Sequence, residues 1–180
     1  MHLDIEGEEV VKFSQLISAA FHNYFALGND EKQIVDAAVS LITNGIDLRN
    51  KMKSLSFISF VSSIETMVNH EFRDEEVKRC ETCGTQQFRV MGKFRDYLLK
   101  YASDNPETKK EVTDIYYIRS KIVHTGLLFL GDSKIDWSDD KKQNEQWATH
   151  IKVMQVSRVS LTNWLLMRGN EKQKEAVKKE

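Results

Sequence analysis

Apolar residues recur every three or four positions along most of this 180-residue chain, and only eight glycines and one proline interrupt the pattern. Spacings of three and four follow one face of an α-helix, whereas a half-buried strand alternates every second residue. Glycine and proline are the strongest breakers of regular structure, so their scarcity leaves long segments free to stay helical. The sequence therefore predicts an all-α fold.

Five segments carry the helical pattern, and we expect them to pack as a bundle of about five helices. They cover approximately residues 31–48, 54–72, 88–102, 106–124 and 144–167. Asp30 is the expected N-cap of the first helix, and Pro106 suits the first turn of the fourth. Gly126 is expected to end that fourth helix. The second helix is apolar around most of its circumference, so we expect it to be the most buried.

Length and composition place these helices in one domain with short additions at both ends. A chain of 180 residues, 41% hydrophobic and 29% charged, has the size and composition of one soluble globular domain. We expect an N-terminal extension packed on the bundle at residues 1–29 and the helical domain at 30–168. Residues 10–27 fit either a helix or a β-hairpin with a helical turn. The charged tail at 169–180 has little to bury, and we expect it to be disordered.

Charge and hydropathy limit the partners. The chain carries 26 basic and 27 acidic residues, for a formal net charge of -1, so it lacks a global basic surface for DNA. Any contact with RNA must therefore come from a local patch of basic residues. No apolar run approaches the length of a membrane span of about 18 residues, and the acidic N-terminus is unlike a signal peptide. We therefore expect a cytoplasmic protein that does not contact membranes.

The segment IYYIRSKIVHTG, at residues 115–126, carries the clearest chemistry. Arg119 can hold a phosphate through its planar fork of donors, and His124 can transfer protons near neutral pH. Such a pair suits RNA cleavage without a metal. Five steps along a regular helix put the two side chains roughly 140° apart, so one chain forms the site poorly unless the last turn unwinds. Two chains paired by a two-fold axis would solve this problem.

This segment resembles the signature of the HEPN superfamily, in which Arg precedes His by four to six residues near the end of a late bundle helix. Within that group of helical bundles, which includes many RNases, it is similar to the Apea-like HEPN domains of bacteria. The earlier segment FVSSIETMVNHEF, which contains Glu65, resembles a core helix of the family. Ser120 follows the Arg where catalytic members commonly have Asn, Asp or His. The resemblance implies a toxin or phage-defence RNase whose site forms between two copies of the chain.

The resemblance implies cleavage by acid and base catalysis. A base removes the proton of a ribose 2′-hydroxyl, whose oxygen attacks the adjacent phosphorus and leaves a 2′,3′-cyclic phosphate and a 5′-hydroxyl. We expect His124 to be the base or the acid and Arg119 to stabilise the phosphorane. Glu65 is expected to orient Arg119, and Ser120 or Lys121 to contact phosphate. This chemistry requires no metal and no other cofactor.

The same residues allow a different interpretation. His124 could cap the helix end, and Arg119 could pair with a buried acid. Tyr116 and Tyr117 are candidate RNA-binding residues that could stack on bases, although at least one of them is expected in the core. The alternative function is therefore a non-catalytic HEPN-like helical module that binds RNA, a nucleotide or a protein.

Cys80 and Cys83 form a Cys-x-x-Cys motif between two predicted helices. Two thiolates at this spacing can chelate a structural zinc ion, with His70 as the nearest further ligand or with four thiolates shared in a dimer. Because a second Cys-x-x-Cys is absent, reduced structural thiols or a redox pair also fit. The zinc interpretation predicts a small zinc-stabilised domain that binds proteins.

Overall fold

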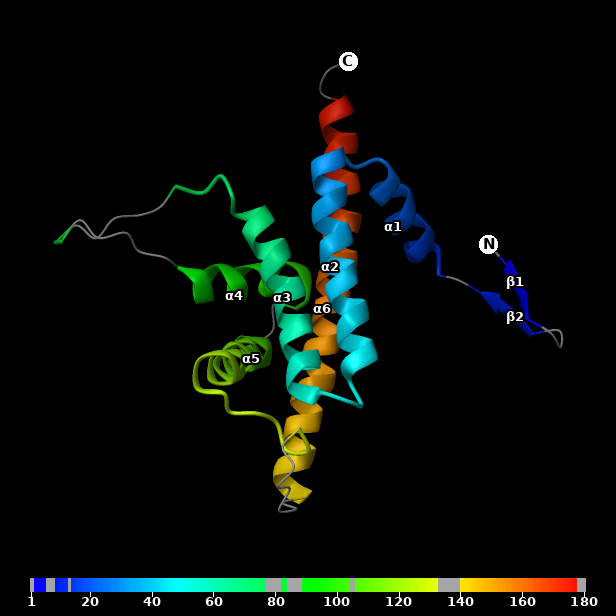
Figure 1. Cartoon of the computed structure of the whole chain (residues 1–180). Coiled ribbons are helices and arrows are strands. Elements are labelled where there is room, and N and C mark those ends of the chain that lie inside the picture. Colours follow the sequence, from blue (N-terminus) through cyan, green and yellow to red (C-terminus); the bar gives the residue numbers. More distant parts are fainter. Residues whose placement is uncertain are drawn as a thin grey trace.

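The computed structural model describes residues 2–5, 9–12, 14–76, 82–83, 89–103, 106–132 and 140–177. Within these ranges the chain forms six helices and one antiparallel β-hairpin (Figure 1). The elements are β1 (His2–Ile5), β2 (Glu9–Lys12), α1 (Gln15–Phe25), α2 (Asn29–Leu48), α3 (Lys53–Glu71), α4 (Val90–Tyr101), α5 (Pro106–Thr125) and α6 (Asp140–Val177). The prediction of an all-α bundle is confirmed.

The residues that begin and end α2 and α5 agree with the sequence prediction at one helix end and differ from it at another. α5 begins at Pro106, and Gly126 directly after it adopts a φ of 67°, which favours glycine. Its N–H donates to the carbonyl of Ile122 at 3.2 Å, so Gly126 ends the helix as predicted. The prediction that Asp30 caps α2 is wrong. Gly28 is the N-cap, and the Glu31 carboxylate accepts the Gly28 N–H at 3.4 Å.

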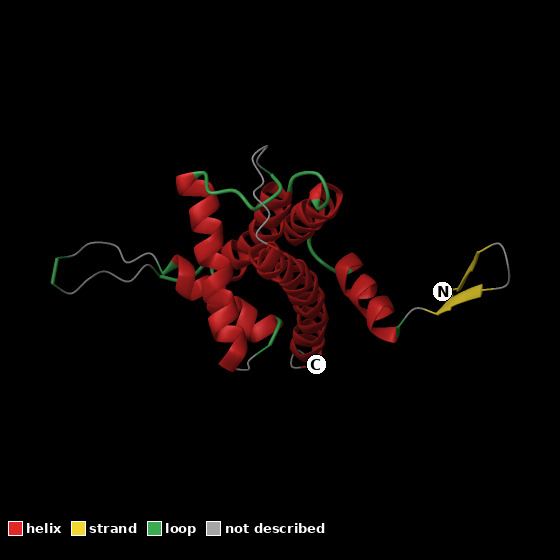
Figure 2. Cartoon of the chain, turned by 90° about the horizontal axis from the view of Figure 1, so that it is seen from below, coloured by secondary structure: helices red, strands yellow, loops and turns green. Residues whose placement is uncertain are grey.

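The N-terminal segment adds a helix and a hairpin beside the bundle, whereas the C-terminal segment extends one of the bundle helices. α1 packs on α6, where Asn23 Nδ2 donates to the carbonyl of Leu165 at 3.1 Å, while the hairpin lies beyond α1 and away from the other helices (Figure 2). α6 continues past Gly169 to Val177, so residues 170–177 are helical where the sequence predicts disorder. Glu, Lys, Gln and Ala dominate this stretch, and their high helix propensity makes extension of an existing helix favourable.

α3 lies at the centre, with α2 and α6 on one side and α4 and α5 on the other (Figure 1). Its side chains Phe57, Phe60, Val61 and Ile64 are fully buried, which confirms the expectation that it is the most buried helix. Gly45 of α2 lies against Phe60, and a Cβ there would come within 2.7 Å of the ring. Within the described ranges, no helix combines the length and apolar content needed to cross a bilayer.

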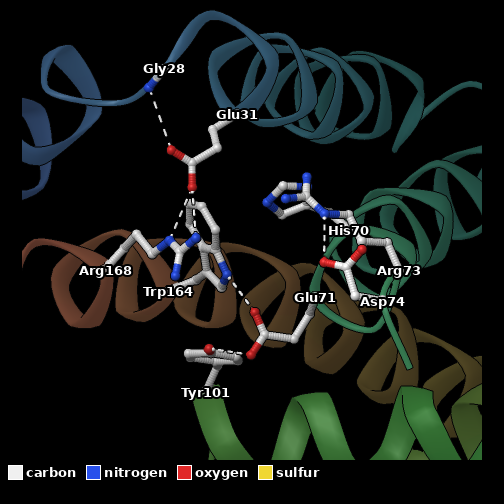
Figure 3. A network of polar contacts seen from close by, with 9 residues as sticks. All are labelled: Gly28, Glu31, His70, Glu71, Arg73, Asp74, Tyr101, Trp164 and Arg168. Carbon is white, nitrogen blue, oxygen red and sulfur yellow. Dashed lines mark hydrogen bonds and ion pairs between the residues drawn. The ribbon is translucent and has the colours of Figure 1, made fainter. Parts of the chain in front are cut away.

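Two carboxylates join α2, α3 and α4 to α6 (Figure 3). Glu71, at the end of α3, accepts hydrogen bonds from Lys100, Tyr101 and Trp164 at 2.7, 2.8 and 3.0 Å. Glu31 of α2 pairs with Arg168 of α6 at 2.9 Å. These contacts fix the C-terminal part of α6 against the three helices, whereas α5 packs against α3 and α4.

Candidate functional site

Arg119 is paired with Glu65 across the α3–α5 contact. Nε of Arg119 lies 3.1 Å from Oε1 of Glu65, and Nη2 donates to Oε2 at 3.3 Å. The side chains are 24% and 21% exposed, so both remain reachable from solvent. The pairing expected from the sequence is therefore present. Engagement of both carboxylate oxygens fixes the plane of the guanidinium.

A pocket of about 230 Å³ opens beside this ion pair, between α3, α4 and α5. Tyr116 forms one wall, with its ring 5.9 Å from Cζ of Arg119 and 5.3 Å from the ring of Phe94. Tyr116 is partly buried against the core, which agrees with the expectation that at least one of the two tyrosines packs there. The remaining lining residues are Glu65, Val68, Asn69 and Val90.

His124 lies in the last turn of α5 and is exposed. Its ring has no hydrogen bond or ion pair within the part of the chain that the structure describes. α5 remains helical to Thr125, so the separation of roughly 140° from Arg119 persists. Arg119 points toward Glu65 of α3, and a single chain does not bring Arg119 and His124 together.

The predicted RNA-contacting residues divide between two sides of α5. Tyr117, Lys121 and His124 follow spacings of four and three, which place them along one side of the helix; we call this side the outer face of α5. Tyr117 is 60% exposed, and the Lys121 ammonium lies 5.2 Å from the centre of its ring. Ser120 is partly buried beside this face. An exposed aromatic ring, a cation and an imidazole are thus aligned on the outer face.

Exposed apolar side chains surround the end of the outer face. Val123, Leu127 and Leu128 are 49%, 61% and 46% exposed. Clusters of exposed large apolar residues are uncommon on monomers and often mark interaction sites. The surroundings of His124 are therefore apolar and open to a partner, in contrast to the partly buried surroundings of Arg119.

The structure does not support the zinc site. Cys80 lies outside the described residues, and Cys83 is exposed. His70, the expected further ligand, lies 3.5 Å from Nη1 of Arg73 through its Nδ1 and packs edge-on against Trp164. Across the described ranges, no group of three or more His, Cys, Asp and Glu side chains could hold a metal ion.

Sequence reasoning missed a groove between two helices and a buried histidine. The groove, about 470 Å³, lies between α2 and α3, and its lining includes Gln33, Asn69, His70 and Arg73. Burial, together with the positive charge of Arg73, lowers the pKa of His70 below its usual value. His150 of α6 is buried. The sequence signals neither feature, because the groove forms between separate helices and a histidine on an apolar stripe has no distinctive pattern.

Scans against protein-family models, curated proteins and solved structures find no match to this chain. The resemblance to HEPN domains therefore stays a prediction that rests on the segment around Arg119 and His124.

Proposed function

We propose that this protein is a metal-independent endoribonuclease that acts as a homodimer. The observation that carries the proposal is the outer face of α5, where His124 is exposed, unpaired within the described residues and aligned with Lys121 and Tyr117. Imidazole supplies acid and base catalysis, the lysine attracts phosphate and the tyrosine ring suits stacking on an RNA base. The HEPN resemblance supports the same chemistry and a role as a toxin or phage-defence effector.

The dimer supplies what one protomer lacks. Arg119 and His124 lie on different sides of α5, so a phosphate held by one protomer's Arg119 would meet the imidazole of the other protomer. The base removes the proton of the 2′-hydroxyl, O2′ forms a bond to phosphorus, and the bond to the 5′-oxygen breaks. The second imidazole donates a proton to that leaving oxygen. Arg119 stabilises the charge that develops on the phosphorane oxygens.

A second function is favoured by the ion pair between Arg119 and Glu65. A carboxylate already balances the guanidinium within the fold, and such pairs often serve to connect helices. In that case the protein is a non-catalytic helical module that binds RNA, a nucleotide or a protein. A measurement of RNA cleavage distinguishes the endoribonuclease from the non-catalytic module.

The test is cleavage of a mixed pool of single-stranded and structured RNAs in EDTA. We expect wild type to leave 2′,3′-cyclic phosphate ends and His124→Ala to cleave about 100-fold more slowly or worse, because acid–base catalysis contributes roughly 10²–10⁴-fold. Arg119→Ala should also lose activity. The matched control is His22→Ala, which replaces another exposed histidine, on α1, and should retain full activity.

Circular dichroism of each variant accompanies the assay. His124 is exposed and should be removed without loss of helicity or thermal stability. If wild type cleaves no RNA in the pool, or if folded His124→Ala cleaves as fast as wild type, the nuclease proposal is wrong. The absence of cleavage by wild type would favour the non-catalytic module.

Dimerisation can be tested at the apolar end of the outer face. Leu127 is 61% exposed beside the end of α5, so Leu127→Glu would place a charge in an apolar interface without disturbing the core. We expect sedimentation to show a dimer for wild type and a monomer for Leu127→Glu, with cleavage lost in the monomer. Leu16→Glu is the matched control, because Leu16 is 62% exposed on α1. An active monomer would contradict the shared site.

A further inference from the structure

We infer that the pocket beside Arg119 binds a guanine base. The inference rests on the proposed function for its biological setting, because a nuclease with this pocket would favour RNA that presents guanine next to the cleaved bond. Base binding itself requires neither cleavage nor His124. The two ideas can therefore fail separately.

The size and walls of the pocket suit one flat ring system. Its volume of about 230 Å³ is below the roughly 300–1,000 Å³ of pockets for drug-sized ligands. The ring of Tyr116 forms an aromatic wall, and the ring of Phe94 supports it at 5.3 Å. Val68 and Val90 add apolar surface. Unstacked RNA bases are commonly bound against such aromatic side chains.

The charged groups at the pocket can still form hydrogen bonds with a ligand. Each oxygen of a carboxylate has two acceptor positions, and the contacts with Arg119 engage each oxygen of Glu65 only once. Nη1 of Arg119 has no hydrogen bond or ion pair to any other described residue. Asn69 is exposed at the pocket and offers both a donor and an acceptor. Acceptors and donors thus lie side by side.

The net charge of the pair argues for a neutral ligand. One carboxylate and one guanidinium in direct contact cancel over a short distance, so the part of the pocket that they line carries no net charge. A neutral polar ring with both donors and acceptors complements it better. Arg119 also holds the Glu65 carboxylate in place before the ligand arrives, which reduces the entropy lost on binding.

Among the four RNA bases, guanine has the complementary edge. Its N1–H and N2–H groups are adjacent donors that can reach an acceptor position of Glu65 that Arg119 leaves open and the side-chain oxygen of Asn69, and its O6 and N7 are acceptors of the kind that arginine contacts most often. Adenine, cytosine and uracil each lack two adjacent ring-edge donors flanked by an acceptor. Each of them would use fewer of the acceptor and donor positions that the Arg119–Glu65 pair leaves open, which weakens binding relative to guanine.

Titration calorimetry with the four nucleoside 5′-monophosphates tests the inference on the full chain. We expect guanosine monophosphate to bind with saturation and at least about tenfold more tightly than the other three, since a good bidentate contact discriminates by roughly that factor or more. Equal binding of all four would mean that phosphate or stacking alone is recognised. That result, or no binding of any, overturns the inference.

Two variants test whether guanosine monophosphate binds in this pocket. Val90→Trp places a large side chain among the residues that line the pocket, and it should abolish guanosine monophosphate binding. Val159→Trp is its matched control, because Val159 is 44% exposed and Val90 is 49% exposed; it should bind as wild type does. Glu65→Gln should reduce the preference for guanine to less than about threefold. Unchanged binding by folded Val90→Trp would show that the ligand lies elsewhere.

His124→Ala keeps the inference distinct from the proposed function. It should bind guanosine monophosphate as wild type does and fail to cleave RNA. Guanine binding by a wild type that does not cleave would refute the nuclease and retain the pocket. Cleavage by a wild type that does not bind guanosine monophosphate would support the nuclease and refute guanine binding in the pocket.

Discussion

Trp164→Ala is expected to lower the free energy of unfolding by about 3–5 kcal/mol, the range for removal of a large aromatic side chain from a core. Trp164 is 1% exposed, and its ring contacts His70 of α3, at 5.6 Å between ring centres. The Nε1–H donates to the Glu71 carboxylate at 3.0 Å. Alanine would therefore leave a cavity and remove one of three donors from a partly buried carboxylate.

Urea unfolding followed by circular dichroism measures this effect. Trp147→Ala is the control of the same residue type, because Trp147 is 43% exposed on α6; its loss should cost about 1 kcal/mol, as expected for one aromatic contact. Equal destabilisation by the two variants would show that Trp164 does not hold α6 against α3.

The ionisation of Glu71 makes the stability contributed by its contact with Trp164 depend on pH. Burial alone would raise the pKa of its carboxyl, but hydrogen bonds from Lys100, Tyr101 and Trp164 outweigh burial and hold the pKa below its usual value. The carboxylate therefore stabilises the fold above the pKa of the unfolded chain, and this contribution is lost as pH falls through the lower pKa of the folded state. Trp164→Ala removes one donor, so part of that pH dependence should disappear with it.

Helical periodicity was sufficient to place α2 to α5, because each is long and buries one continuous apolar face against the others. Periodicity was insufficient at the ends. α1 is short, and its apolar residues include Leu16, Phe21 and Phe25, which are exposed rather than turned toward a core. The stretch after Gly169 contains few apolar residues, so the hydrophobic pattern predicts disorder, whereas the helix propensity of its residues favours the extension of α6 to Val177.

The candidate site was predictable to the extent that it lies on one helix. Arg119, His124 and their angular separation follow from sequence spacing, and the partner Glu65 follows from an acidic residue on an apolar helix. The pocket beside the ion pair was not predictable, because Val90 and Phe94 reach it from α4 through packing of three helices. His150 was missed for a similar reason, since its partner Ser56 is 94 residues away in the chain.

His150 forms a buried polar contact inside an aromatic cluster. Its Nε2 lies 2.9 Å from Oγ of Ser56, and Ser56 donates its own proton to the carbonyl of Gly45. The serine oxygen therefore accepts a hydrogen from Nε2, which places a proton of the imidazole on that nitrogen. Trp147 stacks on the ring at 5.8 Å, and Phe60 meets it edge-on.

Protonation of this ring is unfavourable in the folded state. Burial lowers the pKa of His150 to about 4, the positive charges of Arg49 and Lys53 act in the same direction, and Asp132 opposes them. The second ring nitrogen, Nδ1, is buried and has no hydrogen-bond partner among the described residues. A proton added there would place a charge in an apolar site that already lies near two cations.

We therefore expect the protein to lose stability as pH falls from about 6.5, the usual pKa of histidine in an unfolded chain, to about 4. In this window the unfolded chain binds a proton that folded His150 does not, so the free energy of unfolding decreases by up to about 3 kcal/mol. His150→Leu keeps an apolar side chain at this position and cannot titrate. Its unfolding free energy should depend less steeply on pH.

Urea titrations at several pH values between 4 and 7 compare the two proteins. His70, whose pKa is also lowered, contributes to the slope of both and cancels in the difference. If wild type and His150→Leu lose stability in parallel, then His150 is protonated in the folded protein, and the contact with Ser56 cannot depend on a neutral ring. A smaller slope for His150→Leu would instead show that the α2–α3–α6 core tolerates this imidazole only without charge.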